Sequence, residues 1–136
     1  MRGSVRRERE MAVPADAAWA RISDAAGLAG WFPGIESSTV EGDVRTITMG
    51  SGIPLAETIL TNDAIQRRFQ YRIAGGLFKE HLGTIDVIPT AADRCLVVDS
   101  SDADPATMAI VLGGATGNAL DELARQLETG STEKGA

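Results

Sequence analysis

The longest amphipathic segment of the chain runs from Pro105 to Leu127. Its apolar residues recur mostly at steps of three and four, and charged or amide side chains fall between them, a pattern typical of a helix that buries one side. We expect Asp104 to cap this helix, Pro105 to occupy its first position and Gly130 to end it. Because the chain before it is rich in short strands, the apolar side of the helix is predicted to pack on a sheet.

Three glycines interrupt the first half of this predicted helix: Gly113, Gly114 and Gly117. Each destabilises a helix by roughly 1 kcal/mol relative to alanine. They therefore indicate either a kinked first half or a close approach of the helix backbone to another element. The missing side chains also favour an unfilled space beside the helix.

Between Ile35 and Ser101 the hydrophobic period changes to two, and turn residues separate the segments. Consecutive hairpins of this kind predict an antiparallel sheet. Two short helices, Ala15 to Ser23 and Asp24 to Trp31, are expected after the first strand, with Trp19 and Ile22 buried. The predicted strands are Val5 to Val13, Ser37 to Glu41, Val44 to Met49, Leu55 to Thr61, Ile65 to Ile73, Leu82 to Ile88 and Arg94 to Ser100.

One face of the strand from Ile65 to Ile73 carries Phe69 and Tyr71 and is predicted to point inward. A hairpin that closes at Asn62-Asp63 would place Glu57 beside Phe69 on the same face. A carboxylate would then lie in an apolar wall, where burial raises its pKa.

Composition sets the outer limits. A chain of 136 residues is expected to form one domain over 1–136, ordered from about residue 4 to residue 128 and followed by a disordered tail, 129–136. The net charge of −6 argues against nucleic-acid binding, and no stretch approaches the roughly 20 apolar residues of a membrane-spanning helix. We therefore expect a cytoplasmic protein, a monomer or weak homodimer, without stable membrane insertion.

The chain has a single cysteine, Cys95, and a single histidine, His81. These counts exclude an intrachain disulfide, a cysteine zinc cluster and the standard catalytic triads, so we expect neither a metal nor a cofactor. Counting through the Gly75-Gly76 turn places His81 opposite Gln70 on the outer face of the sheet, in solvent.

The order of these elements, with several short motifs, resembles the START-like or SRPBCC superfamily, and within it the small bacterial proteins grouped as polyketide cyclase/dehydrase and lipid-transport-like. The resemblance covers the chain from Val5 to Leu127. It implies an α+β helix-grip fold, in which a curved antiparallel sheet of about seven strands holds a long C-terminal helix and encloses a cavity for an apolar or amphipathic molecule. The motifs are Val13-Pro14-Ala15 to Trp19, Ser23-Asp24, Trp31-Phe32-Pro33-Gly34-Ile35, Glu57, Tyr71, Gly83 to Pro89 and Asp104-Pro105.

The polar residues of such a cavity have two interpretations each. Glu57 and Tyr71 either orient a ligand or do acid-base chemistry, or else they complete the fold, Glu57 through a pair with Arg67, Tyr71 or a backbone donor. Arg9 and Asp99 fall on the inner faces of the first and last strands, which are neighbours in this fold. Together with Arg7 they form either a ligand anchor or an internal ion pair.

Aromatic and aliphatic residues supply the rest of the predicted site. Trp19, Trp31 and Phe32 either surround the mouth of the cavity or fasten the short helices to the sheet. The ligand-binding residues predicted from the sequence are Glu57, Phe69, Tyr71, Met108, Leu112, Trp31, Asp99 and Arg9.

Three functional hypotheses follow. The first is a protein that binds a hydrophobic or amphipathic small molecule, lipid- or polyketide-like, between the sheet and the long helix. The second is a cyclase or dehydratase-type enzyme that uses Glu57 and Tyr71 as acid-base groups, so whether the chain is an enzyme stays open. The third is a toxin-like or stress-response interaction protein with a filled interior and no ligand.

Overall fold

A seven-stranded antiparallel sheet curves around one long helix in the computed structural model, which describes residues 1–135. The strand order is β1-β7-β6-β5-β4-β3-β2, so each strand after β2 pairs with the next along the chain and β1 closes the sheet beside β7. The strands are β1 (Gly3–Met11), β2 (Ile35–Glu41), β3 (Val44–Met49), β4 (Pro54–Asp63), β5 (Arg68–Ile73), β6 (Glu80–Ala91) and β7 (Arg94–Asp104). The helices are α1 (Ala15–Ser23), the 3₁₀ helix η1 (Ala25–Gly30) and α2 (Ala106–Thr129).

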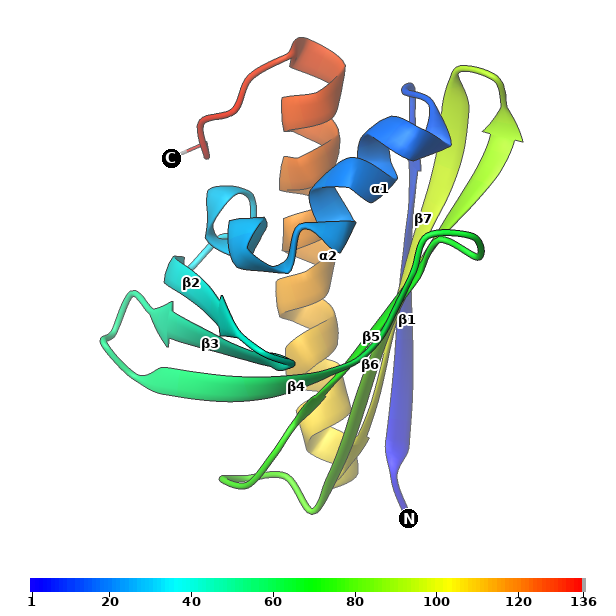
Figure 1. Cartoon of the computed structure of the whole chain (residues 1–136). Coiled ribbons are helices and arrows are strands. Elements are labelled where there is room, and N and C mark those ends of the chain that lie inside the picture. Colours follow the sequence, from blue (N-terminus) through cyan, green and yellow to red (C-terminus); the bar gives the residue numbers. More distant parts are fainter. Residues whose placement is uncertain (136) are drawn as a thin grey trace.

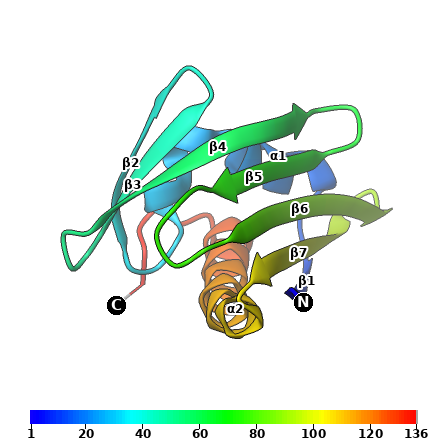
Figure 2. The same cartoon turned by 90° about the horizontal axis from the view of Figure 1, so that it is seen from below.

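The sheet bends into an arch, and α2 lies in its concave side, as the end-on view in Figure 2 shows. The helices α1 and η1 lie at the end of the arch where α2 ends (Figure 1). The core fills the space between them, with Leu120 and Leu123 of α2 packed in one cluster with Phe69 and Val97 of the sheet. This architecture confirms the predicted helix-grip fold.

The helix α2 begins one residue later than the sequence indicated. Asp104 does not cap it: Asp104 is the last residue of β7, and its carbonyl accepts a hydrogen bond from Lys79 N at 2.8 Å. Pro105 occupies the cap position in an extended conformation, and Ala106 is the first helical residue. The predicted end is confirmed, because Gly130 has a φ of 73°, the left-handed conformation that glycine adopts readily.

The glycines of α2 permit close packing on β1 rather than a kink. A Cβ atom at Gly113 would lie 2.8 Å from Val5 Cγ2 and 3.2 Å from Arg7 Nη2, so only glycine allows this approach. Gly114 faces open space on the outside of the helix. The expectation that these glycines leave room toward a cavity was therefore wrong.

The predicted start of β5 was also wrong. Ile65 is 86% exposed, and residues 64–67 form a turn whose backbone is held by Asp63: its Oδ1 accepts hydrogen bonds from Ile65 N and Gln66 N. Arg67 has a φ of 52° and so cannot continue a strand. This turn lengthens the connection between β4 and β5 and changes the register on which the site depends.

Residues 131–135, predicted from the sequence to be part of a disordered tail, lie along α2 toward η1 (Figure 1). Gly135 N donates to Glu122 Oε2 at 3.1 Å, and Lys134 Nζ donates to the carbonyls of Phe32 and Ile35 at 3.2 and 2.7 Å. Ala136 lies outside the described residues.

Candidate functional site

A cavity of about 110 Å³ lies between the concave face of the sheet and α2. Most of its lining is apolar, and its polar residues come from β3, β4, β5, β7 and α2. The sheet contributes Ile35, Arg45, Ile47, Met49, Leu55, Glu57, Phe69, Tyr71, Ile73, Ile85 and Asp99, the helix α2 contributes Leu112, Ala115 and Thr116, and α1, η1 and the segment after it contribute Ile22, Leu28, Trp31 and Phe32.

Six of the eight predicted ligand-binding residues line this cavity: Glu57, Phe69, Tyr71, Leu112, Trp31 and Asp99. Arg9 does not, because its side chain extends across the edge of the sheet to α2, where Nη1 pairs with Asp121 Oδ1 at 2.5 Å. Met108 belongs to the first turn of α2 and is not among the residues within 1–135 that line the cavity.

Glu57 is buried as predicted, but its neighbours differ from those expected. It lies opposite Ile73 rather than beside Phe69, because β4 extends to Asp63 and has a bulge between Ile59 and Thr61. Its partner is Arg45 of β3, which sequence reasoning missed.

Arg45 and Glu57 form a buried ion pair. Their side chains are 4% and 5% exposed, and Arg45 Nε donates to Glu57 Oε1 at 2.7 Å. Burial raises the pKa of Glu57, and the charge and hydrogen bond of Arg45 oppose this rise. The guanidinium carbon also lies 5.2 Å from the ring centre of Phe69 and 5.4 Å from that of Tyr71, within cation–π range. The period of two in β3, which gives Arg45 the same face as Ile47, was the signal that could have found it.

Asp99 is the second buried carboxylate of the cavity, 3% exposed between Val97 and Ser101 on the inner face of β7. Its Oδ1 has no hydrogen-bond partner within residues 1–135. Burial raises its pKa from 3.8 to about 7. Arg7 lies opposite it on β1, but the guanidinium of Arg7 turns to the carbonyl of Arg6 and to α2, so the predicted arginine–Asp99 pair does not form in the described chain.

Tyr71 lies across the sheet toward Asp99 because Gly83 leaves room for it. Tyr71 and Gly83 lie opposite each other on β5 and β6. A Cβ atom at Gly83 would lie 2.4 Å from the Tyr71 ring and 2.8 Å from the Tyr71 hydroxyl oxygen. Burial, with the nearby carboxylates Asp99 and Glu57, raises the pKa of Tyr71 well above 10, so its hydroxyl remains protonated.

His81 lies on the inner face, 1% exposed, and not in solvent as predicted. The observed pairing of Tyr71 with Gly83 differs from the predicted pairing of Gln70 with His81 by an odd number of residues, and an odd shift exchanges the two faces of a strand. His81 Nδ1 accepts a hydrogen bond from Ile73 N at 2.9 Å, and burial, with Arg72 nearby, lowers the pKa of His81 to about 4.

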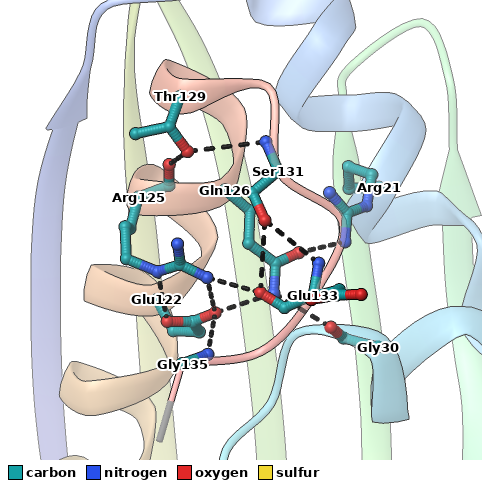
Figure 3. A network of polar contacts seen from close by, with 9 residues as sticks. All are labelled: Arg21, Gly30, Glu122, Arg125, Gln126, Thr129, Ser131, Glu133 and Gly135. Atoms are coloured by element: carbon teal, nitrogen blue, oxygen red, sulfur yellow. Dashed lines mark hydrogen bonds and ion pairs between the residues drawn. The ribbon is translucent and has the colours of Figure 1, made fainter.

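One wall of the cavity, the segment 30–35, is fastened by the C-terminal part of the chain. Gln126, 1% exposed, donates from Nε2 to the carbonyl of Gly30 at 3.0 Å and accepts from Arg21 at 2.7 Å, as Figure 3 shows. Trp31 and Phe32 follow directly, with ring centres 5.9 Å apart, and both line the cavity, whereas Trp19 is buried in the core outside it. Trp31 and Phe32 therefore line the cavity and also pack in the core between the short helices and the sheet, as both interpretations of these residues required.

The fold and the enclosed cavity together define a helix-grip protein of the kind that the sequence resembled. A family model described as "Polyketide cyclase / dehydrase and lipid transport" matches residues 2–128, and the chain belongs to this family. No curated protein matches the chain by sequence. None of the described helices is long and apolar enough to cross a membrane, and residues 1–135 contain no cluster of three His, Cys, Asp or Glu side chains placed to hold a metal ion.

Solved structures share the fold at low sequence identity. A protein from Bacillus thuringiensis is 23% identical with a TM-score of 0.85, over 92% of this chain and 98% of its own. The protein XoxI from Bacillus cereus is 21% identical with a TM-score of 0.86, over 92% and 95%. Norcoclaurine synthase from Thalictrum flavum, in complex with dopamine and hydroxybenzaldehyde, is 21% identical with a TM-score of 0.75, over 93% and 87%. At these identities the likeness establishes the fold alone.

Proposed function

We propose that this protein binds a small, mostly apolar molecule with one polar end in the cavity between the sheet and α2. The observation that carries the proposal is a mostly apolar cavity lined by one buried carboxyl group, that of Asp99, whose Oδ1 has no partner in the described chain. Buried polar groups are nearly always hydrogen-bonded, and an exception inside a cavity is accounted for by a ligand or by water. Membership of a family that includes lipid transport agrees with this function.

The size of the cavity limits what it holds in this conformation. A volume of about 110 Å³ is below the roughly 300–1,000 Å³ of sites for drug-sized ligands, and an apolar cavity of about 150 Å³ holds benzene. The closed cavity therefore suits a single ring or a short acyl segment. A whole lipid or polyketide would require the wall at 30–35 to move outward.

The lining residues divide into two roles under this proposal. Phe69, Leu112 and Trp31 surround the apolar body of the ligand, while Asp99 and Tyr71 contact its polar end. Glu57 is already paired with Arg45, so it contributes to the fold of the wall and does not orient the ligand.

A second candidate function is acid-base catalysis of the cyclase or dehydratase kind. The observation in its favour is that the pKa of Asp99 is raised to about 7, near the pH at which a general acid or base works best. Asp99 and Tyr71, rather than Glu57 and Tyr71, would then be the acid-base groups.

Binding of ethylbenzene, followed by two-dimensional NMR of the labelled protein, tests the proposal. We expect shifts of the amides of Phe69, Tyr71 and Leu112. Leu112→Trp fills the cavity and should abolish these shifts, whereas Val111→Trp, on the 62% exposed neighbour, should leave them intact. Absence of binding to the wild-type protein, or equal binding by both variants, would overturn the proposal. If ethylbenzene binds as expected, native mass spectrometry of protein from its own host is the measurement that would identify the natural ligand.

A further inference from the structure

Several buried polar atoms gather on one part of the inner sheet surface. Ser101 Oγ, His81 Nε2 and Asp99 Oδ1 each lack a hydrogen-bond partner within residues 1–135. All three lie on β6 and β7 around Gly83, the position that the Tyr71 ring covers. We call Tyr71, His81, Asp99 and Ser101 the polar floor; Tyr71 and Asp99 line the cavity, whereas His81 and Ser101 are not among its lining residues within 1–135. Such a concentration requires an explanation, because a buried polar group without a hydrogen bond destabilises the fold.

Most of the polar floor consists of hydrogen-bond donors. His81 Nδ1 is an acceptor toward Ile73 N, so the proton of the neutral ring is on Nε2. Tyr71 and Ser101 carry hydroxyl protons, and Asp99 supplies another when it is protonated. Tyr71 and Asp99 are the two members that line the cavity, and the group that complements both is an acceptor with two lone pairs.

The charges around Asp99 do not demand a cationic ligand. Arg45 of β3 and Glu57 of β4 neutralise each other, and Arg7, opposite on β1, turns toward α2. Ile85 lies opposite on β6, and from α2 the cavity receives Leu112, Ala115 and Thr116. The titratable group of β5 that faces Asp99 is Tyr71. Asp99 is thus surrounded mainly by apolar and neutral groups, which favour its protonated form.

We propose that the cavity selects a ligand with a carbonyl oxygen, a ketone or an aldehyde, which accepts hydrogen bonds from the hydroxyl of Tyr71 and the carboxyl group of Asp99. This inference rests on the proposed ligand-binding function and adds the chemical class of the ligand. The His81 ring packs against Tyr71, with ring centres 5.5 Å apart. A tyrosine beside a protonated carboxyl group in an apolar site is an arrangement that stabilises negative charge on a carbonyl oxygen.

Four molecules of one shape test the class of ligand: acetophenone, 1-phenylethanol, 1-phenylethylamine and ethylbenzene. Their dissociation constants are measured by NMR titration at pH 5.5 and pH 8.5. We expect acetophenone to bind about tenfold more tightly than ethylbenzene at pH 5.5. Its affinity should fall about thirtyfold at pH 8.5, where a group titrating near pH 7 has lost its proton.

Two variants and a matched control assign the effect to the polar floor. Asp99→Asn keeps an N–H donor without a titrating proton, so the pH dependence of acetophenone binding should disappear. Tyr71→Phe removes the other donor and should weaken acetophenone about tenfold while ethylbenzene binding stays the same. Asp86→Asn, on the outer face of β6, is the control and should retain the wild-type pH dependence.

The outcomes separate this inference from the function on which it rests. If none of the four molecules binds at either pH, both fail. If ethylbenzene binds but acetophenone has no advantage, only the carbonyl inference fails. Preference for the amine, with affinity that rises with pH, would show that ionised Asp99 binds a cation and would overturn the inference, as would preference for the alcohol.

Discussion

The cavity has two buried carboxylates in opposite situations. Glu57, on β4, is paired with Arg45 at 2.7 Å, and this arginine also covers two aromatic rings. Asp99, on β7, is equally buried but has no partner for Oδ1 among the described residues. One wall of the cavity is therefore electrostatically complete, and the other lacks a partner that a ligand can supply.

The difference arises from what each neighbouring strand offers. Arg45 lies directly opposite Glu57 within the sheet, where Phe69 and Tyr71 enclose its guanidinium. Arg7 is likewise opposite Asp99, but it lies on the edge strand β1. The Arg7 side chain therefore packs over the glycines of α2 and not against Asp99. A buried carboxylate thus forms an ion pair when its cross-strand arginine is held in the interior. It stays free to contact a ligand when that arginine can turn out of the interior.

The largest effect is expected from breaking the complete pair. Glu57→Leu leaves the Arg45 guanidinium buried without a counter-charge and should lower the free energy of unfolding by about 3–5 kcal/mol. Urea denaturation at pH 7 measures this loss. The double variant Arg45→Met/Glu57→Leu removes both charges and should recover most of it. A loss below about 1 kcal/mol in the single variant would show that the pair is not formed in solution.

The next effect tests the unmatched acid through pH. Folded Asp99 has a pKa of about 7 instead of 3.8, so between these values the folded state binds more protons and stability falls as pH rises. The free energy of unfolding of Asp99→Asn, relative to that of the wild type, should therefore rise by about 2.5 kcal/mol from pH 5 to pH 8. The measurement is the difference in unfolding free energy across that range. A constant difference would mean that Asp99 has found a partner.

A smaller effect concerns the space that lets Tyr71 reach Asp99. Gly83→Ala places a methyl group against the Tyr71 ring, where the Cβ would lie 2.4 Å away, and should cost about 1–3 kcal/mol while pushing Tyr71 into the cavity. The melting temperature should fall, and ethylbenzene should bind less tightly. Gly114→Ala is the control: its Cβ points into open space on the helix, so it should stabilise by about 0.5–1 kcal/mol.

The sequence predicted the inward face of Glu57 but not its partner. The register between β4 and β5 differs from the predicted one by an even number of residues, so Glu57 kept its face while exchanging Phe69 for Ile73. The error came from the turn at 64–67, where the side chain of Asp63 closes a longer connection than Asn62-Asp63 indicated, and the bulge between Ile59 and Thr61 made the difference at Glu57 even.

The polar floor was harder to predict because an odd register error hid His81. Alternation along β6 leaves both faces possible for this residue, and only the length of the connection before it decides between them. The predicted α1 was confirmed to the residue, since local propensity, with Pro14 before the first turn, defines a short helix. Asp99 was assigned to the right face, but the fate of its arginine neighbours depended on packing at the sheet edge.

The smallest effect is expected at the wall formed by residues 30–35, where Lys134 donates to the carbonyls of Phe32 and Ile35 at 3.2 and 2.7 Å. Lys134→Met keeps the aliphatic stem and removes both hydrogen bonds, so global stability should change by less than about 1 kcal/mol, because the lysine is exposed. Local opening responds more directly, since exchange reports the free energy of each segment. We expect the amides of residues 31, 32, 34 and 35 to exchange about threefold faster with solvent deuterium, and those of β7 around Asp99 to be unaffected.

Lys79→Met, in the turn between β5 and β6, is the matched control. Faster exchange at Asp99 as well would show that the two walls open together, and unchanged exchange at 31–35 would show that Lys134 does not hold this wall in solution.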